Sequence, residues 1–235
     1  MLRVSDLSVS YGGMPALRQV SFHLEAGELI SIIGSNGAGK TTLLKAISGL
    51  LEPISGSIWF EGERINGQPT YEICKKGIIQ VPEGRKIFPR MKVIDNLQMG
   101  AYLPRAKELF RQSLQEVFAL FPLLEQRKKQ MAATLSGGEQ QMLAISRALM
   151  ARPKLIMFDE PSLGLSPKAS QGIFRTIEKL NQEGLTALLI SQDVLQTLSL
   201  AQRAYVLENS RIVMEGKGSD LLQNPKVKEA YLGFS

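Results

Sequence analysis

Apolar and polar residues alternate through the first thirty positions, most clearly over residues 20–25, where valine, phenylalanine and leucine would face inward. This period of two predicts strands with one buried face. Three short and almost continuously apolar runs predict strands buried on both faces, as in a parallel sheet: residues 28–33, 155–158 and 187–190. Residues 56–62 predict one more strand, closed by a turn.

Apolar residues recur at helical spacing in three longer segments. Residues 107–121 form an apolar stripe that stops at Pro122, residues 168–184 form another, and residues 220–232 predict a last helix. The order strand, helix, strand over residues 155–190 indicates parallel pairing. We therefore expect an α/β protein with a parallel central sheet.

The pattern also divides the chain into two parts. Helical spacing dominates residues 86–151, which predicts a small helical lobe. Residues 1–85 and 152–235 supply the strands. We expect these two segments to form one α/β core with an N-terminal antiparallel β part.

Composition narrows the class of protein. The 235 residues are 44% hydrophobic and 21% charged, and no apolar run approaches the roughly 18 residues of a membrane span. The single cysteine, Cys74, excludes an internal disulfide and fits a reducing cytoplasm, while the single histidine, His23, is expected to be a plain surface residue. The net charge of +6 is compatible with nucleic acid, an anionic membrane face or a nucleotide.

Residues 34–42 match the phosphate-binding pattern G-x-x-x-x-G-K-[ST]. A glycine-rich turn between a strand and a helix directs backbone N–H groups at an anion, and the helix dipole adds a positive potential. Lys40 would reach the terminal phosphates, and the Thr41 hydroxyl would bind Mg²⁺. The predicted nucleotide-binding residues of this loop are Gly34, Ser35, Asn36, Gly37, Ala38, Gly39, Lys40, Thr41 and Thr42.

The apolar run 155–158 ends in two acids, Asp159 and Glu160. Ligands of parallel sheets bind beyond the carboxyl ends of the strands, so both carboxylates should face the same crevice as Lys40. Two carboxylates beside a triphosphate are costly unless they share a divalent cation. Asp159 would therefore hold Mg²⁺ through water, and Glu160 would orient or activate the attacking water.

The heptapeptide LSGGEQQ combines two signals. Ser136, followed three residues later by Glu139, predicts a capping box that opens a helix. Capping does not explain Gly137 and Gly138, which would expose N–H groups at the helix N-terminus and form a second anion site. A phosphate loop and a second phosphate-binding helix end, in different lobes, suggest a ligand shared with another copy.

Together, the phosphate loop, LSGGEQQ and LIMFDEPS resemble the ATPase subunit of an ATP-binding cassette (ABC) transporter over essentially the whole chain. The resemblance implies a P-loop NTPase fold and two ATP molecules held head to tail in a dimer. Each would lie between one phosphate loop and Ser136, Gly137 and Gly138 of the other subunit. The resemblance also implies that Tyr11 stacks on adenine, although its residue type alone leaves turn packing open. Residues 81–89 would form a coupling loop that touches a membrane-embedded partner.

Three positions depart from the family pattern: Glu83 stands where most members have glutamine, Gln192 where most have histidine, and Leu165 where aspartate is usual. Gln192 can donate a neutral hydrogen bond but cannot carry a positive charge or relay a proton. We therefore assign Glu160 the larger catalytic share and Gln192 the smaller one. Glu83 could ligate Mg²⁺ directly, or it could pair with Arg85 when no nucleotide is bound.

The segments VPEGRKIFP and EPSLGLSP and the ending Tyr231-Leu232-Gly233 are similar to the ATPases of branched-chain amino acid importers, the LivF-like kind. This narrower resemblance implies ATP-driven import through separate permease subunits, with a solute-binding protein as a further partner. The ATPase subunit itself would lie in the cytoplasm, at the inner face of the cell membrane. The second ATPase subunit of the pair could be identical or related. Importers of urea and short amides remain open as alternatives.

A cassette that acts on DNA or ribosomes is an alternative of another class. It would need long heptad runs, zinc-ligand cysteines or two phosphate loops in one chain. The stretch between Lys40 and Leu135 holds no sustained heptad, and the chain has one cysteine and one phosphate loop. We therefore expect no nucleic-acid partner.

Overall fold

The computed structural model describes residues 1–232, so Gly233 of the C-terminal resemblance lies outside the described residues. Six strands form a central sheet in the order β10-β9-β3-β8-β7-β6. All neighbours are parallel except β9 and β10, which pair antiparallel. The strands are β3 (Leu29–Ile33), β6 (Ile78–Val81), β7 (Leu155–Asp159), β8 (Thr186–Ile190), β9 (Arg203–Glu208) and β10 (Arg211–Gly216).

A second, antiparallel sheet has the order β2-β1-β4-β5. Its strands are β1 (Leu2–Tyr11), β2 (Met14–Leu24), β4 (Ser55–Phe60) and β5 (Glu63–Arg64). The inward positions predicted for residues 20–24 are confirmed, because Val20, Phe22 and Leu24 are all buried. The predicted α/β class, with a parallel core and an N-terminal antiparallel part, is therefore present.

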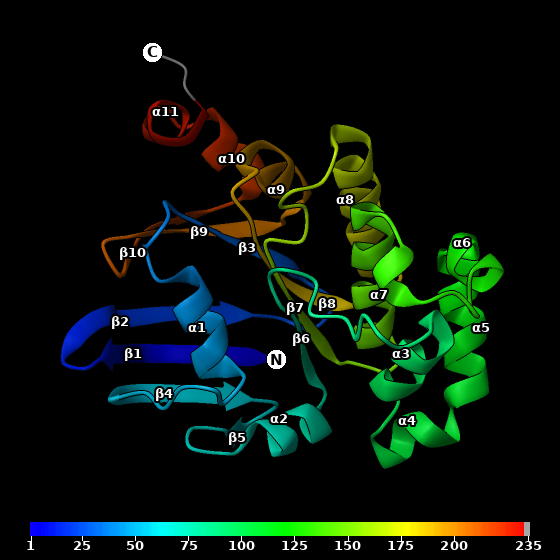
Figure 1. Ribbon diagram of the computed structural model, residues 1–235. Helices are drawn as coiled ribbons and strands as arrows, with labels where there is room; N and C mark the ends of the chain where they lie inside the picture. The colour runs from blue at the N-terminus through cyan, green and yellow to red at the C-terminus, as the bar shows by residue number, and fades with distance from the viewer. Residues whose placement is uncertain (233–235) are drawn as a thin grey trace.

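Helices cover both sheets (Figure 1). The first two are α1 (Lys40–Ile47) and α2 (Thr70–Lys76). Between β6 and β7 the chain is helical: α3 (Val93–Gly100), α4 (Pro104–Glu108), α5 (Phe110–Leu120), α6 (Pro122–Gln126), a 3₁₀ turn (Ala132–Thr134) and α7 (Gly137–Leu149). The later helices are α8 (Pro167–Gln182), α9 (Val194–Leu200), α10 (Gly218–Gln223) and α11 (Pro225–Val227), followed by a π-helical turn (Lys228–Leu232). None of the described helices is both long and apolar enough to cross a bilayer.

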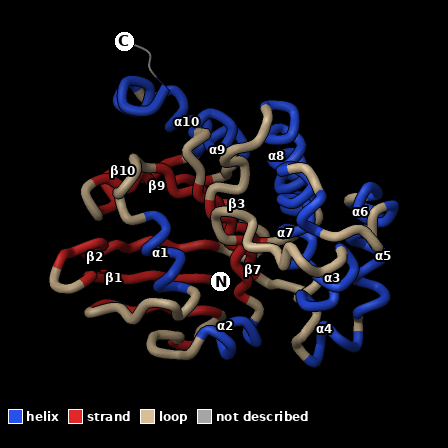
Figure 2. The backbone as a smooth tube through the Cα atoms, in the orientation of Figure 1, coloured by secondary structure: helices blue, strands red, loops and turns tan. Residues whose placement is uncertain are grey.

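The central sheet separates two hydrophobic cores, because successive side chains of a strand point to opposite faces. In β7, Ile156 and Phe158 join the core under α3, α5, α7, α8 and α9. Leu155 and Met157 join the other core, between the central sheet, the antiparallel sheet and α1. Figure 2 shows the same division, with α3 to α8 on one side of the strands and α1 with the antiparallel sheet on the other.

The prediction of one helix over residues 107–121 is wrong in one respect, because the structure has two helices there, α4 and α5. Leu109 ends α4 and begins α5, with φ −95° and ψ 12°. The buried residues Ala106, Ser113 and Val117 keep helical spacing across this break. Apolar periodicity therefore could not reveal it.

The last helix, predicted over residues 220–232, is also broken. Asn224 separates α10 from α11 in an extended conformation, with φ −67° and ψ 125°. The cause is Pro225, which disfavours the helical conformation in the residue before it and has no N–H to continue the helix.

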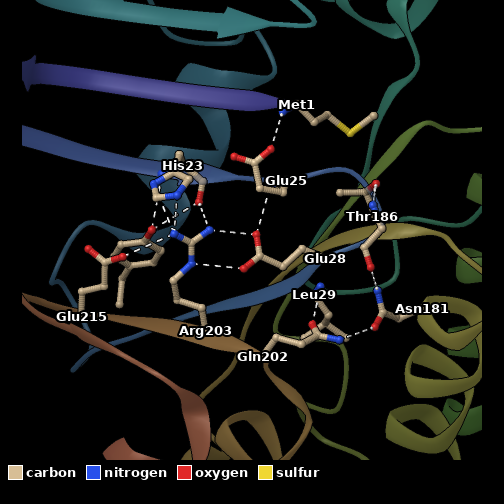
Figure 3. A network of polar contacts seen from close by, with 12 residues as sticks. Met1, His23, Glu25, Glu28, Leu29, Asn181, Thr186, Gln202, Arg203 and Glu215 are labelled. Carbon is tan, nitrogen blue, oxygen red and sulfur yellow. Dashed lines mark hydrogen bonds and ion pairs between the residues drawn. The ribbon is translucent and has the colours of Figure 1, made fainter.

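A polar network fastens the antiparallel sheet to the central sheet (Figure 3). Arg203, at the start of β9, donates to both carboxylate oxygens of Glu28, from Nε at 3.1 Å and from Nη2 at 2.8 Å. The same guanidinium contacts the His23 ring and donates to the His23 carbonyl oxygen at 3.2 Å, and it pairs with Glu215 at 3.4 Å. His23 is exposed as predicted, but it is part of this network rather than isolated.

Replacing Arg203 should lower the stability of the fold. In Arg203→Met, Glu28 loses its bidentate partner although its side chain is only 16% exposed. We expect the free energy of unfolding in urea to fall by about 1–3 kcal/mol, the range for losing hydrogen bonds to charged groups. The matched control is Arg211→Met on β10, an exposed position where about 0.5 kcal/mol or less is expected. Equal effects of the two substitutions would contradict the role given to the network.

Candidate functional site

One cleft of about 460 Å³ gathers most of the predicted site residues. It lies beyond the carboxyl ends of the parallel strands, as expected for this class of sheet. The phosphate loop follows β3, Glu160 follows β7 and Gln192 follows β8. The predicted residues that line the cleft are Tyr11, Asn36, Gly37, Gly39, Lys40, Thr41, Thr42, Glu83, Glu160 and Gln192.

The glycines of the phosphate loop are required by its geometry. Gly37 and Gly39 have φ values of +81° and +111°, in the left-handed region that side chains rarely adopt. A Cβ on Gly34 would lie 2.2 Å from the carbonyl oxygen of Leu207, and one on Gly39 would lie 2.6 Å from that of Ala16. The helix that follows begins with no side-chain cap, so its first N–H groups can bind an anion.

Lys40 is buried, with its ammonium held over the phosphate loop. Its Nζ donates to the carbonyl oxygens of Gly34 at 2.7 Å and Ser35 at 3.1 Å. Burial lowers the pKa of Lys40, and the nearby charges of Glu160 and Asp159 oppose this shift. The ammonium therefore lies between the loop and two carboxylates, where it can bind a phosphate group.

Asp159 and Glu160 are both buried at the end of β7. Burial raises the pKa of each carboxyl group, and the negative charge of Glu83 raises both further. The Thr41 hydroxyl donates to Oδ1 of Asp159 at 3.3 Å. A hydroxyl and carboxylates packed together are the oxygen ligands that Mg²⁺ takes beside a phosphate, so these residues fit that cation.

Glu160 is held in one orientation by the main chain around it. Its own N–H donates to the Ile190 carbonyl oxygen at 2.9 Å, and its Oε2 accepts from the Gln192 N–H at 2.8 Å. Its φ of +49° is unusual for a residue with a side chain. The carboxylate is thus fixed in the cleft as a hydrogen-bond acceptor, and Gln192 positions it through the backbone while its own side chain is exposed.

The LSGGEQQ segment lies outside this cleft, at the start of α7 in the helical region. The predicted capping box is confirmed: Ser136 Oγ accepts from the Glu139 N–H at 3.4 Å, and Glu139 Oε2 accepts from the Ser136 N–H at 2.8 Å. Neither Ser136 nor the two glycines after it line the phosphate cleft. Their predicted contact with a second subunit's nucleotide stays a prediction.

Glu83 and Arg85 do not pair in the described structure. No ion pair joins them among residues 1–232, and Arg85 Nη1 instead donates to Gln140 Oε1 at 3.2 Å. Glu83 is therefore left facing the cleft, where a role as a Mg²⁺ ligand stays a prediction. Tyr11 also lines the cleft and is 46% exposed, which leaves its ring face accessible to a base.

One contact of the C-terminal turn was not predicted. Tyr231, in the last described turn, donates from its hydroxyl to Glu208 Oε1 at 3.0 Å. Burial raises the pKa of this phenol to about 12. The sequence signal was the Tyr231-Leu232-Gly233 ending, but the link from Tyr231 to Glu208 depends on how the last turn packs against β9.

The combined geometry defines a class. A phosphate loop between a buried strand and a helix, facing a second strand that ends in two buried carboxylates, is the site of a P-loop nucleoside triphosphatase.

Known proteins narrow this class. The family described as ABC transporter matches residues 17–163. The high-affinity branched-chain amino acid transport ATP-binding protein BraG of Pseudomonas aeruginosa is 51% identical over 233 residues, covering 99% of this chain and 100% of that protein. The probable branched-chain amino acid transport ATP-binding protein LivF of Archaeoglobus fulgidus is 35% identical, covering 100% and 99%.

Solved structures of ATP-binding cassettes are also similar to this chain. The ADP conformation of MJ1267, an ATP-binding cassette of an ABC transporter, has a TM-score of 0.85 at 30% identity, covering 100% of this chain and 99% of that one. The dimeric post-hydrolysis structure of the cassette MJ0796, bound to ADP and Pi, has a TM-score of 0.80 at 26% identity, covering 92% and 98%. The chain belongs to the ABC transporter family and is an ATP-binding ATPase of it, closely related to BraG.

The contacts of Glu160 predict an order of effects. Glu160→Gln removes the carboxylate, and we expect ATP turnover to fall by about 100-fold or more, the scale of losing a general base. Gln192→Ala retains the backbone N–H that orients Glu160, so we expect a fall of about tenfold or less. Steady-state phosphate release from the two purified variants checks this order. A larger loss in Gln192→Ala than in Glu160→Gln would show that the catalytic shares are assigned wrongly.

Proposed function

We propose that this chain is the ATP-hydrolysing subunit of an importer for branched-chain amino acids. The observation that carries the proposal is the 51% identity to BraG over 99% of the chain. The segments VPEGRKIFP and EPSLGLSP, with the departures at Glu83 and Leu165, support the same assignment. Selectivity for the solute would belong to separate permease subunits and a solute-binding protein.

Hydrolysis of ATP would use the residues of the cleft in separate roles. The backbone N–H groups of the loop and Lys40 bind the β- and γ-phosphates and hold the γ-phosphate in place. Thr41, Asp159 and Glu83 would hold Mg²⁺, which supplies charge neutralisation at the phosphates. Glu160 accepts a hydrogen bond from the attacking water and orients it toward the γ-phosphate, and it can take the proton that the water loses. Burial of this carboxylate keeps competing solvent away from it.

A second cassette would complete the site. Ser136, Gly137 and Gly138 lie at the start of α7 and not in their own chain's cleft. The MJ0796 structure, similar in fold, is dimeric. We infer a head-to-tail dimer in which these three residues bind the nucleotide held by the other subunit, so that ATP closes the dimer and hydrolysis reopens it.

An exposed apolar surface would receive the permease. Its members are five exposed side chains from the segment after α1, α2, the loop of residues 81–89, α3 and the segment after α3: Leu50, Tyr71, Phe88, Met99 and Tyr102. They are connected by contacts beneath them. Gly49 packs on Ile73 of α2, and Asn96 of α3 hydrogen-bonds both the N–H and the C=O of Phe88. Exposed apolar residues gathered in this way mark an interaction surface, and we place it against the permease at the inner face of the membrane.

Transport assays test the proposed solute. The chain should be expressed with the permease and binding proteins encoded beside its gene, in cells that lack their own branched-chain importers. We expect uptake of labelled leucine, isoleucine and valine, and its loss in Glu160→Gln. Uptake of urea or a short amide without leucine uptake would replace the proposal with the alternative importer. ATPase stimulation by DNA or ribosomes, and none by permease-containing membranes, would replace it with the other class.

The apolar surface gives a separate prediction. Met99→Glu places a charge on this surface, and we expect leucine uptake to fall about tenfold or more while basal ATPase activity of the purified chain is retained. The control is Val213→Glu on β10, an equally exposed apolar position outside the surface. Normal uptake in Met99→Glu would show that the permease docks elsewhere.

A further inference from the structure

Arg85 places its guanidinium directly on the first residues of α7. Its Nη1 donates to Gln140 Oε1 at 3.2 Å. A Cβ on Gly137 would lie 2.9 Å from Nη2 and 3.2 Å from Cζ of Arg85. Gly137 does not have a positive φ, and a Cβ there would meet only the movable end of the Arg85 side chain, so these distances show how closely Arg85 lies to Gly137. The same Nη2 lies 4.0 Å from where a Cβ on Gly164 would be, in the loop after Glu160.

The charge of Arg85 is in an unfavourable position for an isolated chain. The N-terminus of α7 carries a partial positive charge, which repels a cation and attracts an anion. Glu139, the acid of this first turn, is already bonded to Arg127 at 3.1 Å and to the Ser136 N–H. Among residues 1–232, Arg85 has no carboxylate partner within ion-pair distance, and its only side-chain hydrogen bond is to the neutral amide of Gln140.

The loop that carries Arg85 connects the two halves of the proposed site. Glu83, two residues earlier, lines the phosphate cleft of its own chain. Arg85 and Lys86 follow with φ values of +66° and +43°, and this turn directs the Arg85 side chain to α7. A guanidinium presented beside Gly137, in the first turn of α7, has the donor geometry that suits a phosphate group.

We propose that Arg85 binds the terminal phosphate of the ATP held by the partner cassette, beside Ser136, Gly137 and Gly138. This inference rests on the head-to-tail dimer of the proposed function and adds to it a charged residue from the loop of residues 81–89. The guanidinium supplies the net positive charge that backbone N–H groups lack. Because the contact is to the terminal phosphate, it exists with ATP and is lost with ADP, so it favours dimer closure by the triphosphate.

The test measures ATP-induced dimerisation of the full chain by light scattering, in the Glu160→Gln background that retains ATP. Adding Arg85→Gln should raise the ATP concentration for half-dimerisation about tenfold or more, as expected for losing charge-assisted hydrogen bonds. Arg85→Lys keeps the charge without the planar guanidinium, so its ATP concentration for half-dimerisation should lie between those of the unchanged chain and of Arg85→Gln. The matched control is Lys86→Gln, which removes the same charge from the next residue of the loop and should leave the curve unchanged.

Two further measurements separate a phosphate contact from a structural role. The affinity of a fluorescent ATP analogue is measured below the concentration of dimerisation, and the thermal unfolding midpoint is measured for each variant. Both should be unchanged by Arg85→Gln, whereas loss of loop structure would alter them. Unchanged dimerisation in Arg85→Gln, or equal losses in Arg85→Gln and Lys86→Gln, would overturn the inference. A Glu160→Gln chain that stays monomeric at saturating ATP would overturn the proposed dimer of identical chains first, and the inference with it.

Discussion

Charge held out of water at the ends of β3 and β7 is the constraint on which this molecule depends. Lys40, Asp159 and Glu160 are all buried there. Burial disfavours the charged form of each group, so it lowers the pKa of Lys40 and raises the pKa of both acids. The positive charge of Lys40 opposes the shift of the two carboxyl groups, and their negative charges oppose the shift of Lys40. There are, however, two acids and one cation. The cleft therefore favours a ligand that brings both phosphates, for Lys40 and the loop N–H groups, and a divalent cation, for Asp159 and Thr41.

The phosphate loop and the start of α7, which form the two halves of the proposed site, lie beside different hydrophobic cores. The phosphate loop leads into α1, whose apolar face packs with the antiparallel sheet. The later residues of α7 pack in the core on the opposite face of the central sheet. The loop of residues 81–89 connects these regions, because Glu83 lines the cleft and Arg85 bonds Gln140. A change at the phosphates thus reaches α7 by a short path, which runs along the loop from Glu83 to Arg85 and then through the hydrogen bond to Gln140.

Much of the site could be predicted from sequence because its parts are local. Gly37 and Gly39 have the positive φ values of a single turn, and the capping box of Ser136 spans three residues. The close approaches of Gly34 to Leu207 and of Gly39 to Ala16 are long-range and could not be predicted in this way. The strands β1 to β4, β7 and β8 were predicted because period two and apolar runs follow directly from burial, whereas β5, β6, β9 and β10 were not predicted. The break at Leu109 was missed because apolar spacing continues across it. The contacts of Arg85 and Tyr231 join residues far apart in the chain, and no local pattern encodes them.

The shared core under the helical region limits how that region can move. Residues of α3 and α7 are packed in one continuous apolar cluster with β6, β7 and α8. Swinging them outward as a hinged lid would expose this cluster to water, at about 25 cal/mol for each Å². Sliding along the sheet face keeps the contacts buried, so shear of the packed helices is the motion available to this fold. Sliding of this kind would displace Ser136 relative to the phosphate loop by less than a hinged opening would.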